Sequence, residues 1–239
     1  MKTDCYDSAN DFKCKRPRSS SSHEFSLVGK SLRSISPGLE TSNSENKLRT
    51  CLEKKASQGD YAVAIALLNE LIALRPNSAK DYNNRGLMHF RNNQISEALI
   101  DLSQALEIDP KLDSAYNNRA NCYAARGELV EAIADYDLAL DLNPANLRAW
   151  INQGITFREL GMYDLSIENF DIALIIGNCF QGRIYAERGR SYHLRGDWNC
   201  AVADYQHGLE ILSAKPEMVK YEQKVKSWLD SLLYPLRPF

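Results

Sequence analysis

The chain has 239 residues, 44% of them hydrophobic and 25% charged, which is enough for one large or two small folded domains. With 29 basic against 31 acidic residues and a net charge of -2, it has no electrostatic reason to bind nucleic acid or an anionic membrane surface. It contains neither an apolar stretch of about 18 residues nor an apolar segment near Met1, so we expect a cytoplasmic protein without a membrane span or secretory signal.

Residues 1–44 are poor in apolar side chains and contain eleven serines. Such a segment cannot bury enough surface to offset the entropy lost on ordering, so we predict a disordered tail. Its seven basic and five acidic residues give it a charge opposite in sign to that of the remainder. The basic run at residues 13–18 is either a docking patch or simply solubilising.

Four segments after the tail align at a period of 34 residues, with one residue inserted before the last. An aromatic residue holds position 4 of each segment, and a small residue holds position 8, which lets two helices approach closely. A more divergent copy precedes them, and its first helix is the weakest part of the pattern. The predicted repeats are 45–78, 79–112, 113–146, 147–181 and 182–215. The shared residues are Tyr82, Tyr116, Trp150 and Tyr185 at position 4, and Gly86, Ala120, Gly154 and Gly189 at position 8.

Positions 7 and 23 of each repeat vary together, and they should face each other across the turn. The pairs Arg85–Asp101, Arg119–Asp135 and Arg188–Asp204 predict an ion pair inside the second, third and fifth repeats. The fourth repeat replaces both members together, with Gln153 and Asn169. We expect these pairs to be structural.

A last helix is predicted at 216–233, where Pro216 begins the segment and Val225, Trp228, Leu229 and Leu232 share one face. Stacked repeats leave an apolar end face, so this helix should cap the final repeat.

The aromatic, glycine, alanine and proline positions of these segments resemble the tetratricopeptide repeat (TPR) family over roughly residues 45–215. The resemblance implies an all-α fold, a right-handed superhelical solenoid of antiparallel helix pairs whose first helices line a concave groove. It also implies a non-enzymatic adaptor or scaffold that binds an extended segment of a partner protein, in the assembly or regulation of a complex. The chain departs from the family at position 7, where arginines replace the usual leucine.

The resemblance places positions 2, 5, 6, 9, 12 and 13 of each repeat on the groove. Asparagines recur at position 6, and a carboxamide can pair with both the N–H and the C=O of an extended peptide. Alternatively, these amides only contact their neighbours. Basic residues make the second half of the groove a candidate for acidic groups. The candidate peptide-binding residues are Asn84, Asn118, Asn152, Asn121, Asn83, Asn117, Lys80, Arg148, Arg183 and Arg190.

Three other functions remain open. A chaperone-type carboxylate clamp is matched at three of its five positions, by Asn121, Asn152 and Arg183, but Asn117 stands where a basic residue is needed and Glu187 would repel a carboxylate. A self-associating structural module is the second, and regulation of the groove by the basic tail is the third. No motif for a nucleophile with its base, no phosphate loop and no metal-ligand spacing occurs, so we expect no catalytic residue, metal or cofactor.

Overall fold

The computed structural model describes residues 37–234, with side chains from residue 44 onward. Within these residues the secondary structure is entirely helical, which confirms the predicted all-α class. No helix in this range is long and apolar enough to cross a membrane. The helices are α1 (Pro37–Ser57), α2 (Tyr61–Leu74), α3 (Ala79–Arg91), α4 (Ile95–Ile108), α5 (Asp113–Arg126), α6 (Leu129–Leu142), α7 (Leu147–Glu159), α8 (Tyr163–Ile176), α9 (Gln181–Arg195), α10 (Trp198–Ser213), the 3-10 turn η1 (Pro216–Met218) and α11 (Val219–Leu233).

The predicted disordered tail overlaps the start of helix α1. The helix begins at Pro37, so residues 37–44 are helical in the structure although the sequence analysis assigned them to a disordered segment. Proline suits the first turn of a helix, and a helix held by packing at its far end can extend outward at little cost. Residues 1–36, and with them most of the predicted tail and its basic run, lie outside the described residues.

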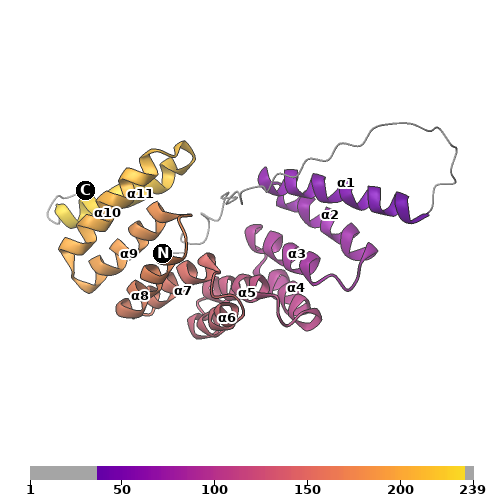
Figure 1. Ribbon diagram of the computed structural model, residues 1–239, viewed down its shortest axis with the longest axis horizontal. Helices are drawn as coiled ribbons and strands as arrows, with labels where there is room; N and C mark the ends of the chain where they lie inside the picture. Colours follow the sequence, from indigo (N-terminus) through magenta and orange to yellow (C-terminus); the bar gives the residue numbers. More distant parts are fainter. Residues whose placement is uncertain (1–36, 235–239) are drawn as a thin grey trace, which may run out of the picture.

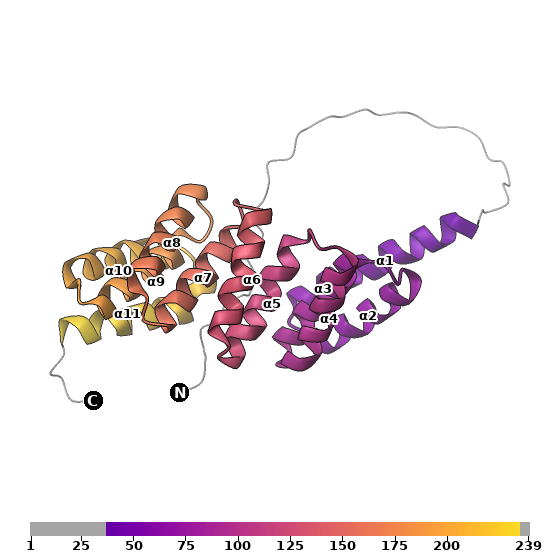
Figure 2. The ribbon, with the colours of Figure 1, turned by 90° about the horizontal axis from the view of Figure 1, so that it is seen from below.

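The helices stack in consecutive antiparallel pairs that follow a curved path (Figure 1). Helices α3, α5, α7 and α9 lie along the inner side of the arc, and α4, α6 and α8 lie along its outer side. The view from below shows the same succession of pairs from α1 to α11 (Figure 2). First helices contact each other from one repeat to the next, so a single surface runs along the inside of the arc.

Each pair is packed by a small residue at position 8 opposite a large one at position 24. A Cβ added to Gly86 would lie 2.7 Å from Leu102 Cγ, and one added to Gly154 would lie 3.1 Å from the ring of Phe170. The third repeat fits Ala120 against Tyr136, and both are fully buried. The first repeat differs, because Leu52 takes position 8 and packs against Leu68. The expected close approach of the two helices is therefore confirmed.

In the turn between the two helices of each repeat, the residue at position 15 has a left-handed backbone conformation, with positive φ. Glycine supplies it in four repeats, with φ between 76° at Gly59 and 95° at Gly196. The second repeat uses Asn93, with φ 60°. Asparagine tolerates this region better than most residues but less well than glycine.

We expect Asn93→Gly to stabilise the protein by roughly 0.5 kcal/mol, because relief of the left-handed strain exceeds the added entropy of the unfolded chain. Urea unfolding followed by circular dichroism measures the difference. Asn92→Gly is the matched control: Asn92 has φ -87°, so glycine there adds only unfolded-state entropy and should destabilise. Equal effects from both substitutions would contradict the assignment of strain to Asn93.

The C-terminal segment begins with a 3-10 turn at Pro216–Met218, and the α-helix proper starts at Val219, three residues later than predicted. Val225 is fully buried against the last repeat, and Trp228, Leu229 and Leu232 pack beside it. The capping role expected for this helix agrees with these contacts.

Candidate functional site

The inner surface carries a connected row of side-chain amides, here called the amide line, formed by Asn83, Asn117, Asn118, Asn121 and Asn152. Asn118 Nδ2 donates to Asn83 Oδ1 at 2.9 Å, which joins α5 to α3. Asn152 Nδ2 donates to Asn121 Oδ1 at 2.9 Å and to Asn117 Oδ1 at 3.4 Å, which joins α7 to α5. The 34-residue spacing therefore brings the predicted asparagines of three repeats together.

The amide line is held from beneath by the core. Asn83 and Asn117 are buried, and the hydroxyl of the fully buried Tyr136 donates to Asn121 Oδ1 at 2.7 Å. These bonds fix the amides in place and use part of their hydrogen-bonding capacity. Asn118, Asn121 and Asn152 remain half-buried.

Asn84 differs from the other position-6 asparagines. Its side chain is half-buried, and its amide makes no hydrogen bond within residues 44–234. One acceptor and two donors are thus left for a ligand. The alternative expectation was that these amides only contact their neighbours. That alternative fits much of the amide line but not Asn84.

Three of the predicted basic residues lie at position 2. Lys80 and Arg148 are exposed, and Arg183 is half-buried. Arg183 Nε is enclosed by protein and has no acceptor among the described residues. A buried donor without a partner costs about 1–3 kcal/mol, so this guanidinium is held where its own chain does not satisfy it.

Glu187 is enclosed rather than exposed on the groove, which corrects the expectation that it would repel a carboxylate. Its carboxyl accepts from Arg158 Nη1 at 2.8 Å and from the Tyr221 hydroxyl at 2.7 Å. Burial alone raises the pKa of this carboxyl, but Arg158, Arg183 and Tyr221 outweigh burial and lower it. The repeat pattern alone does not predict this arrangement, because Tyr221 belongs to the capping helix, 34 residues after Glu187.

Arg190, the remaining predicted groove residue, is occupied by the cap. Its guanidinium lies over the Trp228 ring of α11, 5.5 Å from the ring centroid, and Nη1 lies 3.3 Å from His193 Nδ1. The structure therefore separates the candidates into four groups: an amide line over α3, α5 and α7, the separate amide of Asn84, basic residues at position 2, and an arginine stacked on the cap.

The predicted ion pairs of positions 7 and 23 are confirmed in all three repeats that carry them. Arg119 donates from Nε and Nη2 to both oxygens of Asp135, at 2.7 and 2.8 Å. Arg85–Asp101 and Arg188–Asp204 have the same two-point geometry. Arg85 and Arg188 also reach Asn69 and Asp171 on the second helix of the preceding repeat.

The corresponding pair in the fourth repeat was predicted wrongly. Gln153 Nε2 donates to Asp137 Oδ1 on α6 at 2.7 Å, and Asn169 Nδ2 donates to its own helix at Leu165 O. Asn169 Oδ1 is left buried without a partner. Gln153 thus turns its amide to the preceding repeat and Asn169 turns back to its own helix, so the two do not pair with each other.

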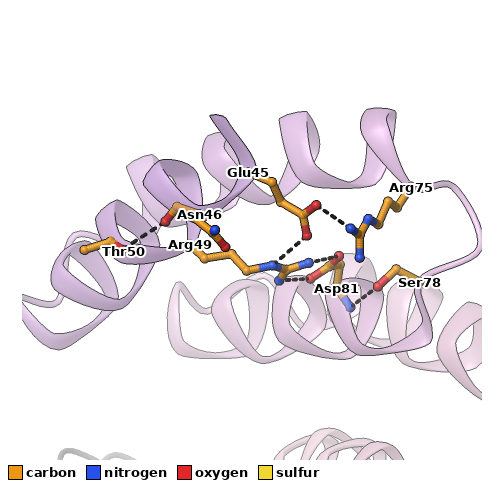
Figure 3. Close-up of polar contacts among 7 residues, drawn as sticks. All are labelled: Glu45, Asn46, Arg49, Thr50, Arg75, Ser78 and Asp81. Carbon is orange, nitrogen blue, oxygen red and sulfur yellow. Dashed lines mark hydrogen bonds and ion pairs between the residues drawn. The ribbon is translucent and has the colours of Figure 1, made fainter. Parts of the chain in front are cut away.

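A second polar cluster joins the divergent first repeat to the second (Figure 3). Arg49 of α1 donates from both terminal nitrogens to the two carboxylate oxygens of Asp81, at 2.8 and 3.1 Å. Glu45 bridges Arg49 and Arg75, and Ser78 Oγ accepts from the Asp81 N–H. Asp81 is fully buried, so the carboxylate depends on Arg49 for its charge balance.

We expect Asp81→Asn to destabilise the protein by about 1–3 kcal/mol at neutral pH, and by less in acid. Burial raises the pKa of Asp81, but the Arg49 hydrogen bonds outweigh it, so the folded-state pKa lies below the ordinary 3.8. A lowered carboxyl pKa stabilises the fold above the ordinary value, and this contribution is lost as pH falls through the folded-state pKa. Urea unfolding of both proteins at pH 7 and pH 3 measures it. A difference independent of pH would contradict the ion pair.

No group of three or more metal-ligating side chains gathers within residues 44–234.

Two family models, both described as tetratricopeptide repeat, match residues 55–120 and 114–146. Residues 55–146 are therefore tetratricopeptide repeats. The two matches cover the end of the first repeat, the second and the third, and the same inter-helix contacts continue through α7 to α10. Tetratricopeptide repeats serve as protein–protein interaction scaffolds, and they are generally not enzymes.

Solved TPR structures share this fold at low sequence identity. A thermophilic TPR protein of Thermus thermophilus has a TM-score of 0.66 and 17% identity, covering 76% of this chain and 98% of that one. A TPR protein from Parabacteroides merdae has a TM-score of 0.62 and 21% identity, covering 80% and 74%. MamA from Desulfovibrio magneticus has a TM-score of 0.61 and 14% identity, covering 72% and 97%. No curated protein sequence matches the chain.

Proposed function

We propose that this TPR protein is a non-enzymatic, cytoplasmic adaptor that holds an extended segment of a partner protein along the amide line, in the assembly or regulation of a complex. The observation that carries the proposal is the connected row of carboxamides on the inner sides of α3, α5 and α7. Carboxamides held by the core can pair with peptide N–H and C=O groups without selecting side chains.

The amides are already fixed before a ligand arrives, which favours binding. A side chain that must be ordered on binding costs about 0.5–1.5 kcal/mol. Hydrogen bonds to Tyr136 and between repeats hold all five asparagines of the amide line in advance. Asn84 adds an uncommitted amide at the second repeat.

A phage library of random dodecapeptides, selected on the full-length protein, tests the proposal. An enriched peptide is then labelled, and its affinity is measured by fluorescence anisotropy. Asn84→Ala should weaken binding about fivefold, and the triple replacement of Asn84, Asn118 and Asn152 by alanine about a hundredfold, at about 1 kcal/mol for each hydrogen bond. Circular dichroism checks that all variants keep their helical content.

The matched control replaces three exposed carboxamides outside the groove, Asn199, Gln206 and Gln223, by alanine. This control should bind as the wild type does. If the groove triple variant binds equally well, the amide line is not the binding site. A mass that rises with protein concentration would then favour the self-associating module instead.

A further inference from the structure

The second helices of the five repeats, α2, α4, α6, α8 and α10, contain no lysine and no arginine. All five carry acidic residues, and the lysines and arginines between residues 61 and 213 lie on first helices or in loops. Arginines of the first helices reach across to some of these carboxylates, as in the pairs of positions 7 and 23. The outer side of the arc, along which α4, α6 and α8 lie (Figure 1), therefore supplies carboxylates and no basic side chain of its own.

Positions 18, 22 and 29 of the repeat share one side of the second helix. They are four and seven residues apart, and they lie opposite the buried positions 20, 24 and 27. On each of α4, α6 and α8, these positions combine an aliphatic residue with an acidic one. We call this surface the outer face, and its residues are Ile100 and Glu107 of α4, Val130 and Asp141 of α6, and Glu168 and Ile175 of α8.

The side chains of the outer face have no partner in the described part of the chain. Ile100, Val130 and Ile175 are 70%, 71% and 85% exposed, more than any other isoleucine, leucine or valine of residues 44–234. The three carboxylates of the outer face are also exposed, and none forms an ion pair within the same range. Exposed aliphatic groups that recur in one register beside unpaired carboxylates suit a ligand that is both apolar and basic.

Residues 13–33 of the chain have this composition. They contain six lysines and arginines against one acidic residue, and Phe25, Leu27, Val28 and Leu32 add apolar side chains. Extended, 21 residues span about 70 Å at most. The path from α4 to α8 takes four steps between packed helices, of about 10 Å each. The segment is therefore long enough to cross the outer face.

We propose that residues 13–33 dock on the outer face, with their lysines and arginines beside its carboxylates and their apolar side chains against its aliphatic groups. The groove suits the same segment less well, because Lys80 and Arg148 are exposed there and repel a basic chain. Docking on the outer side leaves the amide line free for a partner. The inference is thus independent of the proposed peptide-binding function, and it differs from regulation of the groove by the tail.

Limited trypsin digestion of the full-length protein, followed by mass spectrometry, tests the docking, since trypsin cleaves after Lys30 and Arg33. Cleavage of a segment that opens and closes rapidly follows the population of its open form. At low salt, cleavage after these residues should be about tenfold slower in the wild type than in the variant Glu107→Gln/Asp141→Asn/Glu168→Gln. The difference should shrink in 1 M NaCl, where the Debye length falls to about 3 Å.

The matched control, Glu53→Gln/Glu217→Gln/Asp230→Asn, removes three exposed carboxylates elsewhere and should be cleaved as slowly as the wild type. Circular dichroism checks that both variants keep their helical content. Equal cleavage of the wild type and the outer-face variant at low salt would overturn the proposal and leave the outer face to a basic segment of a partner. Protection that increases with protein concentration would also overturn it, because the segment would then dock on a second copy.

Discussion

Replacing Glu187 by alanine should destabilise the protein by about 3–5 kcal/mol, one of the two largest effects expected here. The substitution leaves the Arg158 guanidinium, 7% exposed, without a counter-charge in a buried site. It also removes the acceptor of the Tyr221 hydroxyl, so the capping helix loses its polar link to α9. Equilibrium urea unfolding followed by circular dichroism measures the loss.

An exposed ion pair supplies the control. Asp164 bonds to Arg195, but its side chain is 86% exposed, so Asp164→Ala should cost less than about 1 kcal/mol. The double variant Arg158→Met/Glu187→Leu removes both buried charges and should be more stable than Glu187→Ala. If Glu187→Ala and Asp164→Ala lower the free energy of unfolding equally, the Arg158–Glu187 pair does not behave as a buried ion pair.

Phe170→Ala should cost a similar amount, about 3–5 kcal/mol, for a different reason. Phe170 is fully buried at position 24 of the fourth repeat, where it packs with Ile151 and Ile155 of α7 and Ile184 of α9. Its removal leaves a cavity between two repeats, opposite a glycine that cannot fill it. Urea unfolding gives the change in stability.

Ile175→Ala on the same helix is the matched control, because Ile175 is 85% exposed and should change stability by no more than about 0.5 kcal/mol. Phe170→Leu should cost less than Phe170→Ala, since leucine already holds this position in the second repeat as Leu102. A loss below about 1 kcal/mol for Phe170→Ala would mean that the cluster around it is not tightly packed.

The repeat period predicted the backbone of this protein well. Small residues at position 8, glycines in the turns and the pairing of Arg119 with Asp135 all follow from helices that keep one register. A period of 34 residues fixes which side chains share a face, and with a small residue opposite a large one it also fixes how the helices approach.

The polar partners were predicted less completely, because they depend on the reach of individual side chains between repeats. Gln153 turns to Asp137 of the preceding repeat, and Glu187 is enclosed by a tyrosine of the capping helix. The Arg49–Asp81 pair joins α1 of the divergent first repeat to α3 of the second. The repeat period does not predict which side chains meet there. A hint was present in the sequence, since Tyr221 follows Glu187 at the repeat spacing.

The hydrogen bonds between repeats are unevenly distributed, and this sets where the arc can bend. On the outer side, Arg85, Gln153 and Arg188 each bond to the second helix of the preceding repeat. Arg119 makes no such bond to α4 within the described chain, and on the inner side Asn118 bonds to Asn83 across the same two repeats. Bending about that inner contact opens the outer seam without breaking a polar link. We therefore expect the curvature of the solenoid to change most easily between the second and third repeats, where the outer seam is held by the apolar packing of Ala105 and Leu106 against Ala115.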